Sequence, residues 1–312
     1  MKQNIYFGYI CWKISSRIEI KNPFHDLTVC LFVECVDIIA NWDTQRFRDI
    51  AHRFSASFLY STTAFFVLTQ MLYVVPQVYD TSGVMYKLGC LTTVFITYNI
   101  LANMSACKRT DTSVWSLPWD QLCPSPEDES LWRYCDSCER LMPPRSWHCK
   151  VCKCCILKRS HHCIFTANCV GHNNQRYFFW FTFYMTLGLL LSLGNTIIFM
   201  LKNFDYFYMI TWLWPVAIYL DEFASGPSPP NWLGLTIMFN AYILLPPLVM
   251  FMFQMVSIWR NTVIFDLNND SYNLGLRENF RSIVGQKGLW TFLSPRLKSP
   301  LPHDGTQCPE KK

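Results

Sequence analysis

The sequence predicts an α-helical polytopic membrane protein with four transmembrane helices and a cysteine-rich domain between the second and the third. Three observations predict this fold: four long apolar segments, one hydrophilic stretch crowded with cysteine and histidine, and an apolar composition. Hydrophobic residues make up 51% and charged residues 16% of the 312 residues, and the mean hydropathy is +0.12. This is too apolar for an ordinary soluble domain of this length.

Each apolar segment is long enough to cross a bilayer, which takes about 20 residues. The segments are approximately Phe54–Val75, Val84–Cys107, Tyr177–Leu201 and Trp232–Trp259. A buried core helix is the alternative for any one of them, but four such segments leave little polar sequence to cover them. The expected regions are an N-terminal region (1–53), spans one and two (54–107), the cysteine-rich domain (108–176), spans three and four (177–259) and a C-terminal tail (260–312).

Two further apolar segments are too short to be spans. Leu27–Ala40 contains two acidic residues, which favours an amphipathic or interfacial segment. Tyr206–Leu220 is rich in aromatic residues, which favours an interfacial or re-entrant segment. The apolar run Ile5–Cys11 is too brief for a signal peptide, so we expect the first span to act as the signal anchor.

Lysine and arginine distinguish the two sides of the membrane. Of the 27, seven lie in residues 1–53, ten in 107–176 and eight in 260–312, while the rest of the chain holds only Lys87 and Lys202. The positive-inside rule therefore predicts that the N-terminus, the cysteine-rich domain and the tail face the cytosol. The net charge of +5 indicates topology and anionic lipids. We expect no nucleic-acid partner, since no basic stacking surface or helix-turn-helix pattern accompanies the charge.

The hydrophilic stretch from Cys135 to Cys169 contains eight cysteines and three histidines. Cysteine and histidine pairs a few residues apart can bind one side of a tetrahedral zinc ion, because a short turn brings both ligand atoms to bonding distance. Two such sites need eight ligands, so up to three of the eleven remain for other work. The order is Cys135-x2-Cys138, His148-Cys149-x2-Cys152-x-Cys154-Cys155, Ser160-His161-His162-Cys163 and Cys169.

The residues of this stretch allow two interpretations. The chain has 15 cysteines, which in a reducing compartment indicate metal ligation and reactive thiols more than disulfide bonds. A purely structural zinc scaffold would use its ligands on metal alone. A cysteine beside a histidine that does not bind metal, as in the run 161–163, is instead a nucleophile with a base at hand.

The whole pattern resembles the cysteine-rich domain of the DHHC protein S-acyltransferases, or palmitoyltransferases. The resemblance extends without a gap from Arg133 to Phe178, and a dozen spaced residues from Cys135 to Asn174 carry it. It continues around them at Pro144, Arg145, Asn168, Val170, Gly171, Tyr177 and Phe178.

The resemblance implies two interleaved zinc sites and one active site. One zinc ion would be held by Cys135, Cys138, His148 and Cys155, and the other by Cys149, Cys152, His162 and Cys169. Cys154 is then spare, Cys163 is the nucleophile and His161 is its base. Such a domain is not expected to fold without metal.

The implied activity is transfer of a long-chain acyl group from acyl-CoA, such as palmitoyl-CoA, through a Cys163 thioester to protein substrates. The substrate cysteines would lie close to the lipid bilayer. We expect an endomembrane location, the endoplasmic reticulum or the Golgi, with the active site facing the cytosol.

Two groups of residues are candidates to assist the reaction. Lys150, Lys153, Lys158 and Arg159 would lower the pKa of Cys163 and attract the CoA phosphates, with a solvated basic surface as an equal alternative. Gly188, Ser192 and Gly194 form a small-residue strip on the third span, for which tight helix packing is the favoured interpretation and room for the acyl chain is the alternative.

The sequence departs from the family pattern at three places. Ser160 stands where the family usually has the Asp that orients the histidine. Asp111-Thr112-Ser113 stands where Asp-Pro-Gly is usual, and Asn261–Ile264 keeps one Thr of the usual Thr-Thr-x-Glu. The tail fits the family's C-terminal motif, which packs near the active site, through Tyr272-Asn273-Leu274-Gly275, Asn279 and Gly285.

These features leave three functions open. An active S-acyltransferase is favoured by the retained His161 and Cys163. A weak or inactive relative that acts as a membrane scaffold is favoured by Ser160. A membrane-bound RING-type ubiquitin ligase is the third, although RING ligand spacing leaves no His-His-Cys run.

Overall fold

The computed structural model describes residues 45–124, 129–204, 231–263 and 271–306. The predicted interfacial segments at 27–40 and 206–220 lie outside these residues. The chain divides into two compact units, residues 1–48 and 49–312. Everything below concerns the second unit, apart from the first residues of helix α3 (Gln45–Thr69).

Among the described residues, four helices are long and apolar enough to cross a membrane, as predicted. The first runs through α3, a π-helical turn at Gln70–Val74 and α4 (Val75–Val78). Pro76, in α4, lacks a backbone N–H and crowds the preceding turn, which accounts for the wider π-helical geometry there. The other three are α5 (Val84–Arg109), α6 (Gln175–Asn203) and α8 (Asn231–Arg260).

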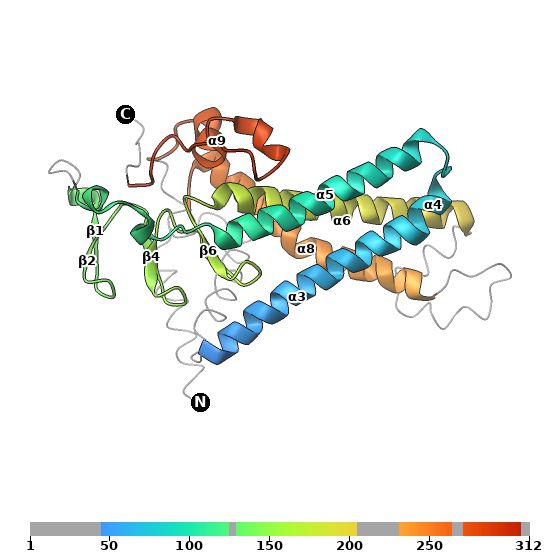
Figure 1. The fold of residues 1–312 in the computed structure, drawn as a ribbon, viewed down its shortest axis with the longest axis horizontal. Coiled ribbons are helices and arrows are strands. Elements are labelled where there is room, and N and C mark those ends of the chain that lie inside the picture. The colour runs from blue at the N-terminus through green and yellow to red at the C-terminus, as the bar shows by residue number, and fades with distance from the viewer. Residues whose placement is uncertain (1–44, 125–128, 205–230, 264–270, 307–312) are drawn as a thin grey trace, which may run out of the picture. The chain divides into compact units, whose positions relative to one another are not determined.

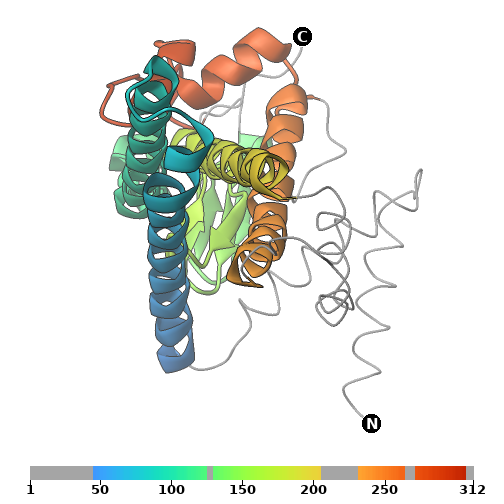
Figure 2. The same cartoon turned by 90° about the vertical axis from the view of Figure 1, so that its right-hand side faces the viewer.

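These helices are longer than the apolar windows. α3 begins well before Phe54, and α5 ends at Arg109, with Lys108 and Arg109 in its last turn. Basic side chains at a helix C-terminus interact favourably with its partial negative charge. α6 packs against both α5 and α8 (Figure 1) and lies between them in the view along the bundle (Figure 2).

The domain between α5 and α6 consists of three small antiparallel hairpins of three-residue strands. They are β1 (Arg133–Cys135) with β2 (Arg140–Met142), β3 (Trp147–Cys149) with β4 (Cys154–Ile156), and β5 (His161–Cys163) with β6 (Asn168–Val170). Short 3₁₀ turns, at Val114–Ser116, Trp119–Leu122 and Glu129–Leu131, lead into them.

The three hairpins repeat one turn. Each has a residue with positive φ at the same place, namely Glu139 (55°), Lys153 (57°) and Ala167 (50°). This left-handed residue lets the chain reverse after the sequence Cys-x2-Cys in the first two hairpins and Cys163-x2-Thr166 in the third. The third hairpin therefore has the shape of the other two but a threonine in place of the second cysteine.

The tail packs through α9 (Leu276–Val284) and the turn Gly288–Phe292. It covers the ends of the spans that are predicted to face the cytosol. Asn279 is fully buried and donates to Trp259 O at 2.8 Å, while its Oδ1 accepts from Leu274 N at 3.0 Å. Gly285 has φ +80°, and a Cβ there would lie 2.5 Å from Ser299 O. The residues of the predicted C-terminal motif thus form the joint between α8 and α9.

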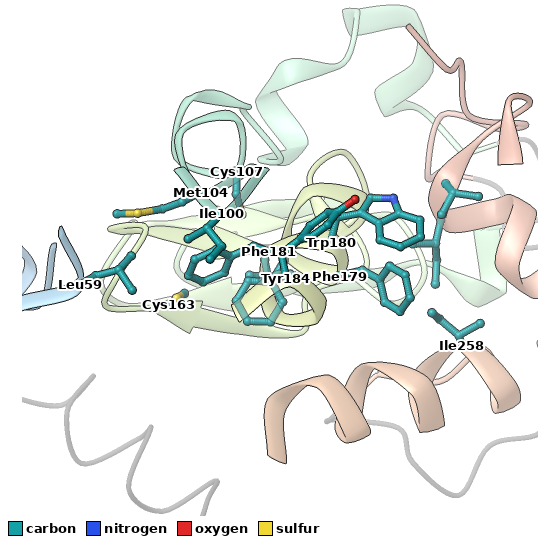
Figure 3. Close-up of a cluster of buried hydrophobic side chains, with 14 of the residues drawn as sticks. Leu59, Ile100, Met104, Cys107, Cys163, Phe179, Trp180, Phe181, Tyr184 and Ile258 are labelled. Atoms are coloured by element: carbon teal, nitrogen blue, oxygen red, sulfur yellow. The ribbon is translucent and has the colours of Figure 1, made fainter. Parts of the chain in front are cut away.

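The main core lies where the spans meet the hairpin domain. Figure 3 shows Cys163 among side chains from α3 (Leu59), α5 (Ile100 and Met104) and α6 (Phe181). Ile283 and Val284 of the tail belong to the same core. Cys163 therefore shares its core with both the membrane helices and the tail.

Candidate functional site

The two metal clusters follow from the alternation of side chains along the hairpin strands. Neighbouring residues of a strand point to opposite faces, so His148 and Cys149 of β3 face different clusters. His148 pairs across the hairpin with Cys155, and His162 pairs with Cys169. This alternation produces the interleaving that the sequence comparison implied.

The first cluster contains Cys135, Cys138, His148 and Cys155, with all four ligand atoms within 4.8 Å of one another. Cys138 Sγ lies 3.3 Å from His148 Nδ1 and 3.9 Å from Cys155 Sγ. A tetrahedral zinc ion with Zn–S bonds of about 2.3 Å separates its sulfurs by about 3.8 Å. The donor set and its spacing fit zinc.

The second cluster contains Cys149, Cys152, His162 and Cys169, again within 4.8 Å. Cys152 Sγ lies 3.6 Å from Cys169 Sγ and 3.3 Å from His162 Nδ1. Hydrogen bonds from Cys152 and Cys169 bring the pKa of Cys149 far below that of an ordinary thiol, and the hydrogen bond with Cys149 raises the pKa of Cys152 to about 12. Three cysteine sulfurs and one imidazole nitrogen at this spacing are a donor set that fits zinc.

Ser160, His161 and Cys163 lie together beside the second cluster and outside both ligand sets. Strand alternation puts His161 and Cys163 on one face of β5 and His162 on the other. Ser160 Oγ lies 3.2 Å from His161 Nδ1, and the imidazole meets Phe178 edge-on at 4.9 Å. Burial lowers the pKa of His161 to about 3, so the resting ring is neutral at pH 7 and its protonation requires a partner for the charge.

Cys163 occupies the position that a metal ligand has in the other two hairpins. Burial raises the pKa of its thiol, and hydrogen bonds from the Thr166 backbone and hydroxyl and from the Phe165 backbone act in the opposite direction. Thr166 thus offers hydrogen bonds to the sulfur where the other hairpins have a second cysteine. Thr166 was not singled out in the sequence. Its spacing from Cys163 could have indicated it, because this spacing repeats that of the two Cys-x2-Cys pairs.

Three residues of the family pattern fix the position of the third hairpin. Asn168 Nδ2 donates to Cys107 O, Lys108 O and Thr110 O at 2.9 to 3.2 Å, which caps the end of α5. Asn174 Nδ2 donates to Cys169 O at 2.7 Å. A Cβ on Gly171 would lie 2.5 Å from Leu157 O, so only glycine fits there.

The four predicted CoA-binding residues do not form one surface. Lys150 and Lys153 are exposed, whereas Lys158 and Arg159 are buried. Lys158 Nζ donates to Asn261 Oδ1 at 3.0 Å, and Arg159 donates to His148 O at 3.3 Å. Arg159 thus binds a group inside the domain, and Lys158 binds a residue that follows α8.

Asn261 was noted in the sequence only as a departure from the family pattern. It also binds Arg145 and donates to Tyr272 O at 2.7 Å. Its positive φ of 51° suits asparagine, which adopts that region more readily than most residues. The residue joins the hairpin domain to the tail.

A cavity of about 300 Å³ lies between α3, α5 and α6. Ile96 and Ile100 line it and also belong to the core around Cys163. Gly188 and Ser192 line it, as expected for the alternative in which the strip leaves room beside the third span. Gly194 is not among its lining residues, and no atom lies within 4 Å of a Cβ built there.

The fold and the site define a multi-pass membrane protein whose second and third spans are joined by a domain with two Cys3His clusters of zinc-binding type. Residues 128–269 match the model of the DHHC palmitoyltransferase family. This similarity argues against the RING-type alternative.

Named relatives agree with the family match. The chain is 27% identical over 217 residues to a probable palmitoyltransferase ZDHHC24 of Rattus norvegicus, covering 66% of this chain and 73% of the relative. It is 28% identical over 218 residues to the Homo sapiens protein of that name, with the same coverage. It is 31% identical over 160 residues to a probable protein S-acyltransferase 12 of Arabidopsis thaliana, covering 49% of this chain and 50% of the relative.

Proposed function

We propose that this protein is a protein-cysteine S-acyltransferase that uses palmitoyl-CoA or another long-chain acyl-CoA. Cys163 would carry the acyl group as a thioester before passing it to a cysteine of a protein substrate near the membrane. Acyl-CoA and the protein that accepts the acyl group are thus the two substrates. The two zinc ions would be structural. The active site would face the cytosol from an endomembrane, the endoplasmic reticulum or the Golgi.

The observation that carries this proposal is the third hairpin. Cys163 has the backbone setting of a zinc ligand, yet its second partner is Thr166, so its sulfur belongs to neither cluster. It lies on the same strand face as His161 and within the core that the spans form. A thiol with a neutral imidazole on its own strand face and hydrogen-bond donors at its sulfur has what a nucleophile requires.

The reaction has two balanced steps. His161 takes the proton of Cys163, whose thiolate attacks the acyl-CoA carbonyl; a C–S bond to Cys163 forms, the C–S bond to CoA breaks, and the proton goes to the departing CoA sulfur. In the second step His161 takes the proton of the substrate thiol, which attacks the Cys163 thioester, and Cys163 regains a proton. The bilayer and the cavity beside Ile100 would receive the apolar chain.

Ser160 is the part of the site that distinguishes this chain from the family pattern. In a Ser-His-Asp triad the carboxylate fixes the tautomer of the histidine and stabilises its imidazolium. The Ser160 hydroxyl can accept a hydrogen bond from His161 Nδ1 and so can hold the tautomer, but it has no charge. We therefore propose an enzyme slower than one with Asp, and the scaffold alternative corresponds to a rate too low to detect.

The CoA moiety would meet the exposed lysines. Lys150 and Lys153 are the members of the predicted basic group whose side chains reach solvent. We propose these two for the CoA phosphates, with Lys158 and Arg159 holding the domain together.

The test is CoA release by the full-length protein in lipid nanodiscs with palmitoyl-CoA and a lipidated peptide that carries one cysteine. We expect CoA release that depends on Cys163 and acyl transfer to the peptide. Cys163→Ala should abolish both and keep the same metal content. No peptide acylation by a folded, two-zinc parent would contradict the enzyme and leave the scaffold.

A further inference from the structure

A histidine of the first span touches the second metal cluster from outside. His52 lies in α3, and its Nε2 atom is 3.2 Å from Nε2 of His162. The ring centroids are 5.2 Å apart at an interplanar angle of 33°. The two residues are 110 positions apart in the chain, so the contact exists only in the folded protein.

His162 presents its two nitrogens to different partners. Its Nδ1 faces the three sulfurs of the cluster, at 3.3 Å from Cys152, 3.6 Å from Cys169 and 3.8 Å from Cys149. A neutral imidazole that binds metal through Nδ1 carries its proton on Nε2. The His162 Nε2–H then donates to Nε2 of His52, and His52 holds its own proton on Nδ1.

His52 stands at the start of the face that α3 turns to the rest of the molecule. Ser55, Leu59, Thr62 and Phe66 follow at intervals of three or four residues and are all buried. This is the spacing of one helix face. Leu59 packs in the core that contains Cys163, so the same face meets first the metal cluster and then the nucleophile.

We propose that His52 is a positioning residue for the second metal site: it accepts the hydrogen bond of His162 and holds that ring with Nδ1 toward the metal. The inference rests on the zinc assignment of the proposed function. Metal-binding histidines almost always donate their other N–H to a fixed acceptor, and loss of that acceptor typically weakens metal binding 10- to 100-fold. Here the acceptor belongs to a transmembrane helix.

A consequence concerns the geometry of the active site. His162 lies between His161 and Cys163 on β5, so a ring that turns would also move the strand that carries both. His52 thereby couples the position of the first span, which lines the cavity through Thr62 and Phe66, to the strand with the nucleophile.

The test compares zinc release from the full-length protein to a chromogenic chelator for the parent and three variants. His52→Phe keeps a ring of similar size but removes the acceptor, and we expect one of the two zinc ions to leave about 10- to 100-fold faster. His52→Gln has an amide oxygen that can accept the hydrogen bond, and it should restore most of the slow release. Arg53→Gln, at the exposed neighbouring position, should match the parent.

Cobalt substitution gives a second readout. In His52→Phe we expect the visible d–d spectrum of one of the two cobalt sites to change. In His52→Gln we expect that spectrum to return toward the spectrum of the parent. Unchanged release and spectra in His52→Phe, with two zinc ions in the parent, would overturn this inference alone. If both zinc ions leave faster from His52→Phe and His52→Gln does not restore slow release, His52 serves only in side-chain packing. Failure of both variants to fold would indicate the same, and either result would overturn the inference. A parent without zinc would overturn the metal assignment and this inference with it.

Discussion

At the residue scale, the two groups proposed to react, Cys163 and His161, are both neutral in the resting site. Burial raises the pKa of Cys163 and lowers that of His161 to about 3, so the resting pair is thiol and imidazole. Formation of the thiolate and imidazolium puts two charges in a buried place, and each needs a partner. Thr166 and Phe165 supply donors for the sulfur, and Ser160 supplies only a hydroxyl for the imidazole.

Ser160 is therefore expected to limit the rate. Ser160→Asp adds a charge that stabilises the His161 imidazolium, so acylation of Cys163 should accelerate, and transfer to a substrate thiol should gain more. Ser160→Ala removes the acceptor and should slow both. Stopped-flow measurement of single-turnover CoA release decides this, and an Asp variant no faster than the parent would show that another group already supplies the charge.

Thr166 is expected to lower the pKa of the Cys163 thiol. Thr166→Val removes a hydroxyl that donates to the sulfur and keeps the side-chain shape, so the pKa of Cys163 should rise. The pH profile of Cys163 alkylation by a small reagent should then move to higher pH, because less thiolate is present at each pH. Thr166→Ser retains the hydroxyl and serves as the control; equal profiles for Val and Ser would contradict this role.

At the element scale, the hairpins share a local sequence pattern. Cys-x2-Cys followed by a left-handed residue is visible at Cys135 and Cys149, and strand alternation accounts for the interleaved clusters. The four helices could also be predicted from apolar length alone. The beginning of α3 could not, because its first turns are polar and do not extend the apolar segment.

The long-range contacts could not be predicted from the sequence. His52 reaches His162, Lys158 reaches Asn261, and neither pair has a local pattern. The basic group at 150–159 was expected to act together, but two of its members are buried by the domain fold. Contacts of this kind depend on the tertiary arrangement and leave no periodicity in the chain.

The ligand assignment predicts opposite effects for two adjacent cysteines. Cys155→Ala removes a ligand of the first cluster and should unfold the domain, because structural zinc supplies on the order of 10 kcal/mol. Cys154→Ala removes a half-buried thiol outside both clusters and should be mild. Zinc content and thermal unfolding measure both, and a severe Cys154 effect beside a mild Cys155 effect would refute the assignment.

The cavity predicts a dependence on chain length. A Cβ on Gly188 would lie 3.1 Å from Ile96 Cγ2, so Gly188→Leu should fill the cavity and slow acylation by palmitoyl-CoA more than by a short-chain acyl-CoA. Gly194→Leu meets no atom within 4 Å at its Cβ and is the matched control. Equal loss for both chain lengths in competition assays would place the acyl chain elsewhere.

At the scale of the whole molecule, metal domain, spans and tail converge on one cysteine. The clusters hold the hairpins, Asn168 and Asn174 fasten β6 to α5, and Asn279 fastens α9 to α8. Leu59, Ile100, Phe178 and Ile283 come from four segments and belong to the same buried core as Cys163. In the proposed function, this arrangement would let the Cys163 thiol meet an apolar chain from the membrane side.

The most direct test is the mass of the Cys163 peptide after the purified protein has been incubated with palmitoyl-CoA. The account predicts one palmitoyl group on Cys163, lost on treatment with neutral hydroxylamine as a thioester is, and absent from Cys163→Ser with both zinc ions retained. An unmodified Cys163 in a folded protein with two zinc ions, or hydroxylamine-sensitive palmitate that persists in full in Cys163→Ser, would contradict it.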